Sequence, residues 1–141
     1  MTIAKAAGAR GQIAVRVYYE DTDFSGLVYH ASYLRFMERG RTELLRSAGF
    51  SQSLLQNSPT QNLVFVVRRM MIDFVKPATM DDLLQIDTSV EAVGAASVEL
   101  SQRVQRDDDL LVSARVTVAS VVSGRPVRLA VDLRQKLCGK G

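Results

Sequence analysis

The sequence is poor in the residues that build cross-links and metal centres. Its 141 residues include one cysteine, one histidine, three prolines and no tryptophan. A lone Cys138 excludes an intrachain disulfide and a cysteine-based zinc site, and it fits a reducing, cytoplasmic setting. No apolar run reaches the ~18–20 residues that span a bilayer, so we expect no membrane span. The N-terminal MTIAKAAGARGQ lacks an apolar stretch, so we expect no secretory signal there.

Most charges are interspersed along the chain. The net charge of +3 and the pI of about 9.3 favour anionic partners such as phosphorylated cofactors. No block of Lys and Arg, RNP pattern or zinc finger is present, so we expect no nucleic-acid partner. The length and the hydrophobic share of 47% predict one packed domain over residues 12–138, preceded by a frayed tail at 1–11.

Hydrophobic periodicity predicts an α+β fold. Residues 12–19 alternate as a strand, and a helical pattern runs from about His30 to Ala48, with Ser32 as a candidate N-cap and Gly49 as the stop. After a polar loop at 51–60, which contains Pro59, the pattern predicts four consecutive strands and a short helix within 62–76, 83–93, 96–106, 110–122 and 130–138. Strands joined by tight turns pair antiparallel. Gly40 inside the helix indicates either a close approach to another element or a tolerated glycine.

Alternation also predicts which strand residues share a face. The two sets are Val64, Val66, Met70, Ile72 and Phe74 on one strand, and Leu110, Val112, Ala114, Val116 and Val118 on another. One helix covers only one face of five or six strands, yet Val67 and Val121 on the other side are apolar. We therefore expect a second copy to complete the sheet, giving a homodimer.

Acidic residues and the only histidine gather in the segment EDTDFSGLVYH, Glu20 to His30, just before the helix. The segment begins like an EF-hand loop, but Ser32 stands where that loop needs a bidentate Glu. A transition-metal site would have one imidazole only, from His30 with Asp21 and Asp23. Neither kind of metal site is favoured, and we expect none.

Two interpretations of this segment remain open from the residues alone. Asp21 and Asp23 are typical turn residues, and His30 is then an ordinary polar group. Alternatively, the free N–H groups and the dipole of the helix N-terminus stabilise an oxyanion while a nearby carboxylate attacks a carbonyl or activates water. Gly26 would then let the backbone approach a ligand or take an unusual dihedral angle.

The longer segment VYYEDTDFSGLVYHASYLRFMERGRTELLRSAGF resembles the 4-hydroxybenzoyl-CoA thioesterase-like branch of the hotdog superfamily. It is most similar to the Tol–Pal-associated acyl-CoA thioesterases. The shared positions are Tyr19, Asp21-Thr22-Asp23, Gly26, Val28-Tyr29-His30, Tyr33, Glu38 and Arg41. The resemblance implies a hotdog fold, in which a curled antiparallel sheet wraps a long helix. It also implies active sites at the interface of a homodimer, or of a tetramer built as a dimer of dimers.

The resemblance also implies roles for single residues. Asp23 is the catalytic carboxylate, as nucleophile or general base, and the backbone N–H of His30 receives the thioester oxygen. The His30 side chain is implicated too, and Tyr29 lines the pocket, while Asp21 holds the loop. Gly26 and Tyr33 are expected at the substrate. Glu38 and Arg41 are expected to form a structural pair on the helix.

The implied reaction is hydrolysis of an acyl-CoA with a short to medium aliphatic chain, or of an acyl carrier protein thioester. No cofactor is expected, since coenzyme A is part of the substrate. The basic cluster that some benzoyl-CoA thioesterases use is replaced by GAAS at 94–97. Arg68 and Arg69 are the preferred phosphate ligands, with Lys76, Arg103 and Arg106 as further candidates. The alternatives are an acyl-CoA or acyl-carrier binding scaffold and a hotdog 3-hydroxyacyl-thioester dehydratase.

Overall fold

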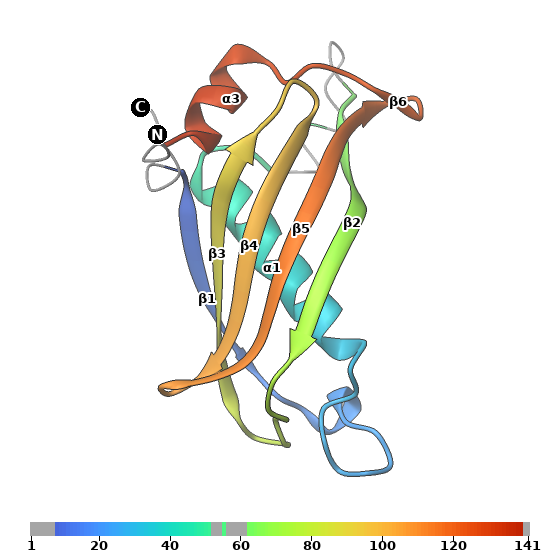
Figure 1. Ribbon diagram of the computed structural model, residues 1–141, viewed down its shortest axis with the longest axis vertical. Helices are drawn as coiled ribbons and strands as arrows, with labels where there is room; N and C mark the ends of the chain where they lie inside the picture. Colours follow the sequence, from blue (N-terminus) through green and yellow to red (C-terminus); the bar gives the residue numbers. More distant parts are fainter. Residues whose placement is uncertain (1–7, 52–54, 56–61, 140–141) are drawn as a thin grey trace.

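Six antiparallel strands form one sheet in the computed structural model, which describes residues 8–51, 55 and 62–139. The strands are β1 (Arg10–Arg16), β2 (Val64–Phe74), β3 (Leu83–Val93), β4 (Ser97–Arg106), β5 (Asp109–Val122) and β6 (Arg125–Pro126). Their order is β1-β3-β4-β5-β2, and β6 pairs with β5 (Figure 1). The α+β class is confirmed. The predicted tail and the 51–60 loop with Pro59 lie largely outside the described residues.

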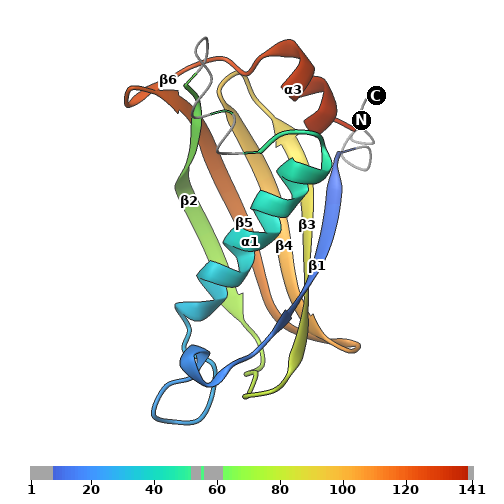
Figure 2. The ribbon, with the colours of Figure 1, turned by 180° about the vertical axis from the view of Figure 1, so that it is seen from behind.

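The helix α1 (Ser32–Ser47) crosses one face of the sheet diagonally (Figure 2). Its buried face includes Tyr33, Phe36, Met37 and Leu44, which pack against inward side chains such as Ile86 of β3. A short helix, α3 (Val131–Leu137), covers the end of the sheet near the last turn of α1. This single layer of helix on a curled sheet is the predicted hotdog arrangement.

Gly49 ends α1 as predicted. Its φ of 96° is the left-handed conformation that glycine adopts without strain. The N–H of Gly49 donates to the Arg46 carbonyl at 3.0 Å, and the N–H of Phe50 donates to the Leu45 carbonyl at 3.1 Å. These two bonds are the Schellman motif, which satisfies the last carbonyl groups of the helix.

Two β-bulges overturn part of the predicted face assignment. In β2 the register shifts between Val67 and Arg69, so Val67 pairs with Val118 while Val66 pairs with Ala119. Phe65 and Val67 therefore share the helix-facing side with Met70, Ile72 and Phe74, and the prediction for Val64 and Val66 is wrong. The extra residue of a bulge reverses the alternation beyond it.

The second bulge lies near the β4–β5 turn. Gln105 pairs with Leu110, whereas Val104 pairs with Val112, so Leu111 is the extra residue. Leu111 is fully buried, and Leu110 lies beside the outward Gln105. The predicted inward position of Leu110 is therefore wrong.

Strand β2 is an edge of the sheet (Figure 1). It and the residues after it carry exposed apolar side chains, namely Val66, Val67, Met71, Phe74 and Val75. An apolar, unpaired edge is the usual place for a further strand to add. The homodimer predicted from sequence has a suitable surface here.

Candidate active site

The loop between β1 and α1 is fixed by Asp21. Its side chain is buried and accepts a 2.9 Å hydrogen bond from the N–H of Tyr18, across the 3-10 turn η2 (Tyr19–Asp21). Its carbonyl accepts from the N–H of Tyr29 at 2.9 Å and from the Ser32 hydroxyl at 3.0 Å. Asp21 thus ties the start of the loop to the start of α1, which is the loop-holding role expected of it.

Asp23 lies on the exposed part of the same loop. Its Oδ1 accepts hydrogen bonds from the N–H of Ser25 at 2.8 Å and from the Ser25 hydroxyl. These two bonds lower the pKa of the Asp23 carboxyl below its ordinary value of 3.8, with a smaller contribution from His30. Asp23 is therefore ionised at neutral pH, and its second carboxylate oxygen has no hydrogen bond from the described residues.

Gly26 closes the turn that follows Asp23. Its φ of 84° is left-handed, and its N–H donates to the Asp23 carbonyl at 3.0 Å. A Cβ at Gly26 would meet nothing within 4 Å. Of the two predicted reasons for this glycine, the structure supports the unusual dihedral angle. The approach of the backbone to a ligand stays a prediction.

The first turn of α1 leaves backbone donors open. Within the described residues, the N–H groups of His30 and Ala31 have no hydrogen-bond acceptor. Such groups and the helix dipole favour negative charge at this end. Ser32 is not the N-cap: it is the first helical residue, Ala31 precedes it, and its hydroxyl donates to Asp21 instead of capping.

Asp23 and His30 line one open hollow between the loop, α1 and the end of β2. Its empty volume is about 620 Å³, part of which is open solvent. The other lining residues are Ser25, Leu27, Val28, Tyr33, Phe74, Val75, Lys76 and Pro77. The hollow therefore joins a carboxylate and an anion-binding helix end to an apolar wall.

Tyr33 lines this hollow and is held in place by two contacts. Its hydroxyl accepts a 3.1 Å hydrogen bond from the N–H of Ala78, and its ring contacts Phe74 with centroids 5.9 Å apart. Burial raises the pKa of the Tyr33 hydroxyl. The Ala78 carbonyl accepts from the N–H of Val28 at 2.9 Å. Ala78 is therefore bonded both to α1, through Tyr33, and to the loop, through Val28.

The remaining predicted residues differ in whether they line the hollow. The Tyr29 ring is half-exposed, packs on His30 with centroids 4.5 Å apart, and is not among the lining residues. Arg68 and Arg69 stand at the bulge of β2 and do not line the hollow, whereas Lys76 does. Ser25 is the main residue that the sequence analysis missed, although Asp followed two positions later by Ser is typical of a side chain that accepts the next-but-one N–H.

Glu38 and Arg41 do not form the expected ion pair. No Glu38–Arg41 contact lies within the 4.0 Å limit for ion pairs in the described chain. Glu38 instead accepts from the Thr42 hydroxyl, and Arg41 donates to the side chain of Gln102 at 3.0 Å. Gln102 comes from β4, far along the chain, so helix spacing alone did not reveal this partner.

Residues 8–51, 55 and 62–139 contain no group of three or more His, Cys, Asp or Glu side chains placed to hold a metal. None of their helices is long and apolar enough to cross a bilayer.

The fold is that of a hotdog thioesterase. The sequence model described as "Thioesterase superfamily" matches residues 25–113, and the chain belongs to this family. It is 48% identical over 111 residues to "Acyl-CoA thioesterase YbgC" of Haemophilus influenzae, covering 79% of this chain and 80% of that protein. Identity to "Acyl-CoA thioester hydrolase YbgC" of Escherichia coli strain CFT073 is 46%, over 76% of this chain and 78% of the relative.

A solved structure agrees with these relatives. The crystal structure of a probable thioesterase from Bartonella henselae has a TM-score of 0.84 and 44% identity, covering 86% of this chain and 100% of that chain. The resemblance drawn from the Asp-Thr-Asp motif is confirmed.

Proposed function

We propose that this protein hydrolyses the thioester of an acyl-CoA to a free acid and coenzyme A. The observation that carries the proposal is the pairing, in one hollow, of the ionised Asp23 carboxylate with His30, whose N–H group is open at the start of α1. Membership of the thioesterase superfamily supports the reaction. The names of the Haemophilus and Escherichia relatives support acyl-CoA as the substrate class.

In the proposed reaction Asp23 is the nucleophile. Its free oxygen attacks the thioester carbon, and the carbonyl oxygen becomes an oxyanion held by the helix N–H groups. The C–S bond then breaks, the thiolate leaves and takes a proton, and an acyl–Asp23 anhydride remains. Water cleaves this anhydride to the acid and regenerates the carboxylate. The lowered pKa keeps the Asp23 carboxylate ionised, which direct attack requires.

Side chains around the hollow fit the substrate's other parts. The apolar wall of Val28, Tyr33 and Phe74 suits a short to medium aliphatic chain. Lys76 lines the hollow and pairs with Asp109 at 3.2 Å, and we propose it as a ligand for a phosphate. Arg68 and Arg69 are candidates for a substrate that extends along β2. The chemistry uses protein groups and water only, so we propose that no metal or redox cofactor takes part.

We further propose that two copies pair along β2. Pairing two β2 strands antiparallel about a two-fold axis would bring the Phe65 end of one strand beside the Phe74 end of the other. The exposed apolar side chains of β2 support this surface, and two such dimers would form a tetramer. The lone thiol of Cys138 suits the reducing cytoplasm as the location.

Thiol release from a panel of acyl-CoAs tests the proposal. Asp23→Asn, folded by circular dichroism, should lose nearly all turnover, by roughly a thousandfold or more, since the nucleophile is gone. Asp108→Asn makes the same change on the exposed β4–β5 turn and should keep the wild-type rate. Wild-type turnover by Asp23→Asn would refute the role of Asp23. An acyl carrier protein thioester with the same acyl group tests the carrier.

A further inference from the structure

The segment of residues 75–82 joins β2 to β3 and forms one side of the hollow that contains Asp23. Three of its residues, Val75, Lys76 and Pro77, line that hollow. Figure 1 shows the segment between the loop before α1 and the β4–β5 turn, and Figure 2 shows the same order from behind. The 75–82 segment can therefore transmit a displacement of the β4–β5 turn to the loop that carries Asp23.

Two connections run from this segment to the loop. The Ala78 carbonyl accepts a hydrogen bond from the N–H of Val28 at 2.9 Å. Thr79 forms an antiparallel bridge with Leu27, whose carbonyl accepts the N–H of Asp23 at 3.0 Å. A shift of the segment would therefore move the backbone of Asp23 relative to the start of α1.

Arg106, at the end of β4, holds the segment from the opposite side. Its Nη1 donates to the Pro77 carbonyl at 3.3 Å and to Oδ2 of Asp82 at 2.9 Å. The same carboxylate oxygen accepts the N–H of Thr79 at 2.9 Å. Arg106 thus bonds to both halves of the 75–82 segment with one guanidinium.

The pair of Arg106 and Asp82 is partly shielded from solvent, with side chains 29% and 20% exposed. Burial alone would raise the pKa of Asp82, but hydrogen bonds from Thr79 and Arg106 bring it below its ordinary value of 3.8. Asp82 is therefore ionised at neutral pH. Hydrogen bonds between ionised groups are roughly twice as strong as neutral ones, and shielded pairs are screened less by salt. These contacts are therefore suited to fixing the segment.

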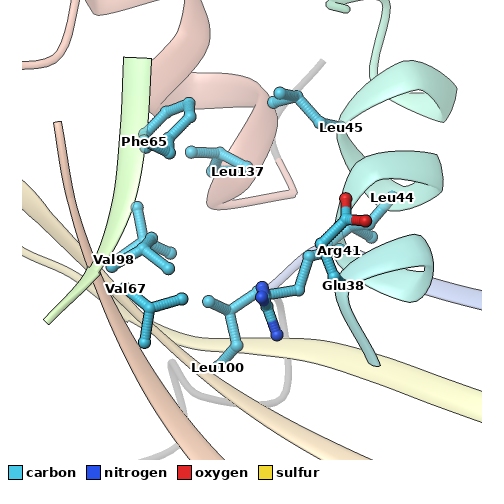
Figure 3. A pocket seen from close by; sticks show the side chains of 10 residues that line it. Glu38, Arg41, Leu44, Leu45, Phe65, Val67, Val98, Leu100 and Leu137 are labelled. Carbon is cyan, nitrogen blue, oxygen red and sulfur yellow. The ribbon is translucent and has the colours of Figure 1, made fainter. Parts of the chain in front are cut away.

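Arg41 provides a comparison, because hydrogen bonds inside the chain hold it too. Its Nη1 donates to Oε1 of Gln102 at 3.0 Å, beside Gly40, where a Cβ would lie 3.1 Å from the Gln102 amide nitrogen. The close approach predicted as one reason for Gly40 is therefore what the structure shows. Arg41 and Glu38 line the hollow between α1 and the first half of β2, at the edge that we pair with a second copy (Figure 3). None of these contacts includes the 75–82 segment.

We propose that Arg106 is a positioning residue for hydrolysis, which holds the 75–82 segment so that Asp23 and the N-terminus of α1 face the same thioester carbon. The inference rests on the proposed function. Arg106 is not among the residues that line the hollow, so it acts through Pro77 and Asp82 and not on the substrate. Without it, both acceptors would turn toward water and the segment would move. Misplacing reacting groups by about 1 Å can cost roughly a hundredfold in rate.

Steady-state thiol release from the acyl-CoA that the wild type hydrolyses fastest tests this role. Arg106→Met, folded by circular dichroism, should lower kcat by roughly tenfold or more and change KM little, because it displaces the reacting groups. Arg115→Met makes the same substitution in a more exposed pair, with Glu99 at 2.5 Å, and should keep the wild-type kcat. A wild-type kcat in Arg106→Met would overturn the proposal. So would a raised KM with unchanged kcat, which would make Arg106 a ligand for the substrate's phosphate.

Amide hydrogen exchange provides a second measurement that does not need activity. The N–H of Val28 should lose protection in Arg106→Met and keep it in Arg115→Met, since its acceptor lies on the displaced segment. Arg106→Lys, which can still donate to Asp82, should lose less protection and less turnover than Arg106→Met. Wild-type protection of Val28 in Arg106→Met would refute the positioning role even if turnover fell. Absence of thiol release from the wild type would refute the proposed function instead.

Discussion

The two ends of α1 hold their polar groups in opposite ways. At the N-terminal end the backbone N–H groups of His30 and Ala31 are open, and the Asp23 carboxylate is exposed to solvent. Toward the other end the charged group is a side chain, Arg41, oriented by the fully buried Gln102. Backbone groups need only the correct loop, whereas a buried cation needs a partner for every polar atom around it. The first end is therefore sensitive to loop conformation, and the second to packing.

Gln102→Leu should disrupt the hydrogen bonds around Arg41 and leave the N-terminal end of α1 unchanged. The substitution removes three hydrogen bonds, those to Arg41, Met37 and Thr88. We expect a loss of about 2–3 kcal/mol in the free energy of unfolding, because buried polar groups lose partners. Urea unfolding measures it, and thiol release per folded molecule should not change.

Gln12 provides the matched control for that experiment. It is exposed and bonds to Asp87 at 2.8 Å, so Gln12→Leu should change stability by no more than about 0.5 kcal/mol. A similar loss of unfolding free energy in both glutamine variants would show that burial does not determine how much the Gln102 hydrogen bonds stabilise the fold.

Gly40→Ala tests the packing of α1 against Thr88 and Gln102 with a smaller change. Alanine is the better helix former by about 1 kcal/mol, yet the new Cβ would approach the Thr88 hydroxyl and Ile86 Cγ2 at 2.8 and 3.0 Å. We expect a net destabilisation of about 1–2 kcal/mol, since overpacking outweighs propensity. Thermal unfolding measures whether the variant is destabilised or stabilised. A stabilised variant would mean that the side chains around Gly40 move to admit the new Cβ at little cost.

Ser25→Ala should change the pH dependence of activity, which depends on the N-terminal end of α1, and should leave the hydrogen bonds around Arg41 unchanged. Because Ser25 lowers the pKa of Asp23, losing its hydroxyl moves that pKa back toward 3.8. Activity that needs the ionised carboxylate falls as pH drops through this pKa, so the acidic limb of the kcat/KM profile should move to higher pH. The Ser25 N–H still donates to Asp23 in this variant, so only the contribution of the hydroxyl is lost. An unmoved limb would separate Asp23 ionisation from the rate.

Local chemistry explains which parts of the fold the sequence predicted. Gly49 is read directly as a helix stop, and alternation located β3 at Leu83–Val93 with its observed bounds. The bulges in β2 and β5 were not predicted, since four consecutive apolar residues from Val64 to Val67 look the same in either register. Only the partner strand decides which of them faces the helix.

The same division applies to the site. The Asp-Thr-Asp segment and its helix are contiguous, so the motif alone located Asp23 and His30 together. The Arg41 network joins α1 to β3 and β4 through Thr88 and Gln102, and no local spacing connects these residues. The i, i+3 rule instead suggested Glu38 as the partner of Arg41, and tertiary contact overrode it.

Ala78 shapes how this protein tolerates change. Its N–H and its carbonyl hold Tyr33 and Val28, while its own methyl group is fully buried. Both bonds use the backbone N–H and carbonyl of Ala78, so no substitution at this position except proline, which lacks the N–H, removes them. A mutational scan would record Ala78 as a position that rejects larger side chains, although its backbone anchors the loop that carries Asp23. The position of that loop therefore depends on the backbone of Ala78 as well as on the side chain of Asp21.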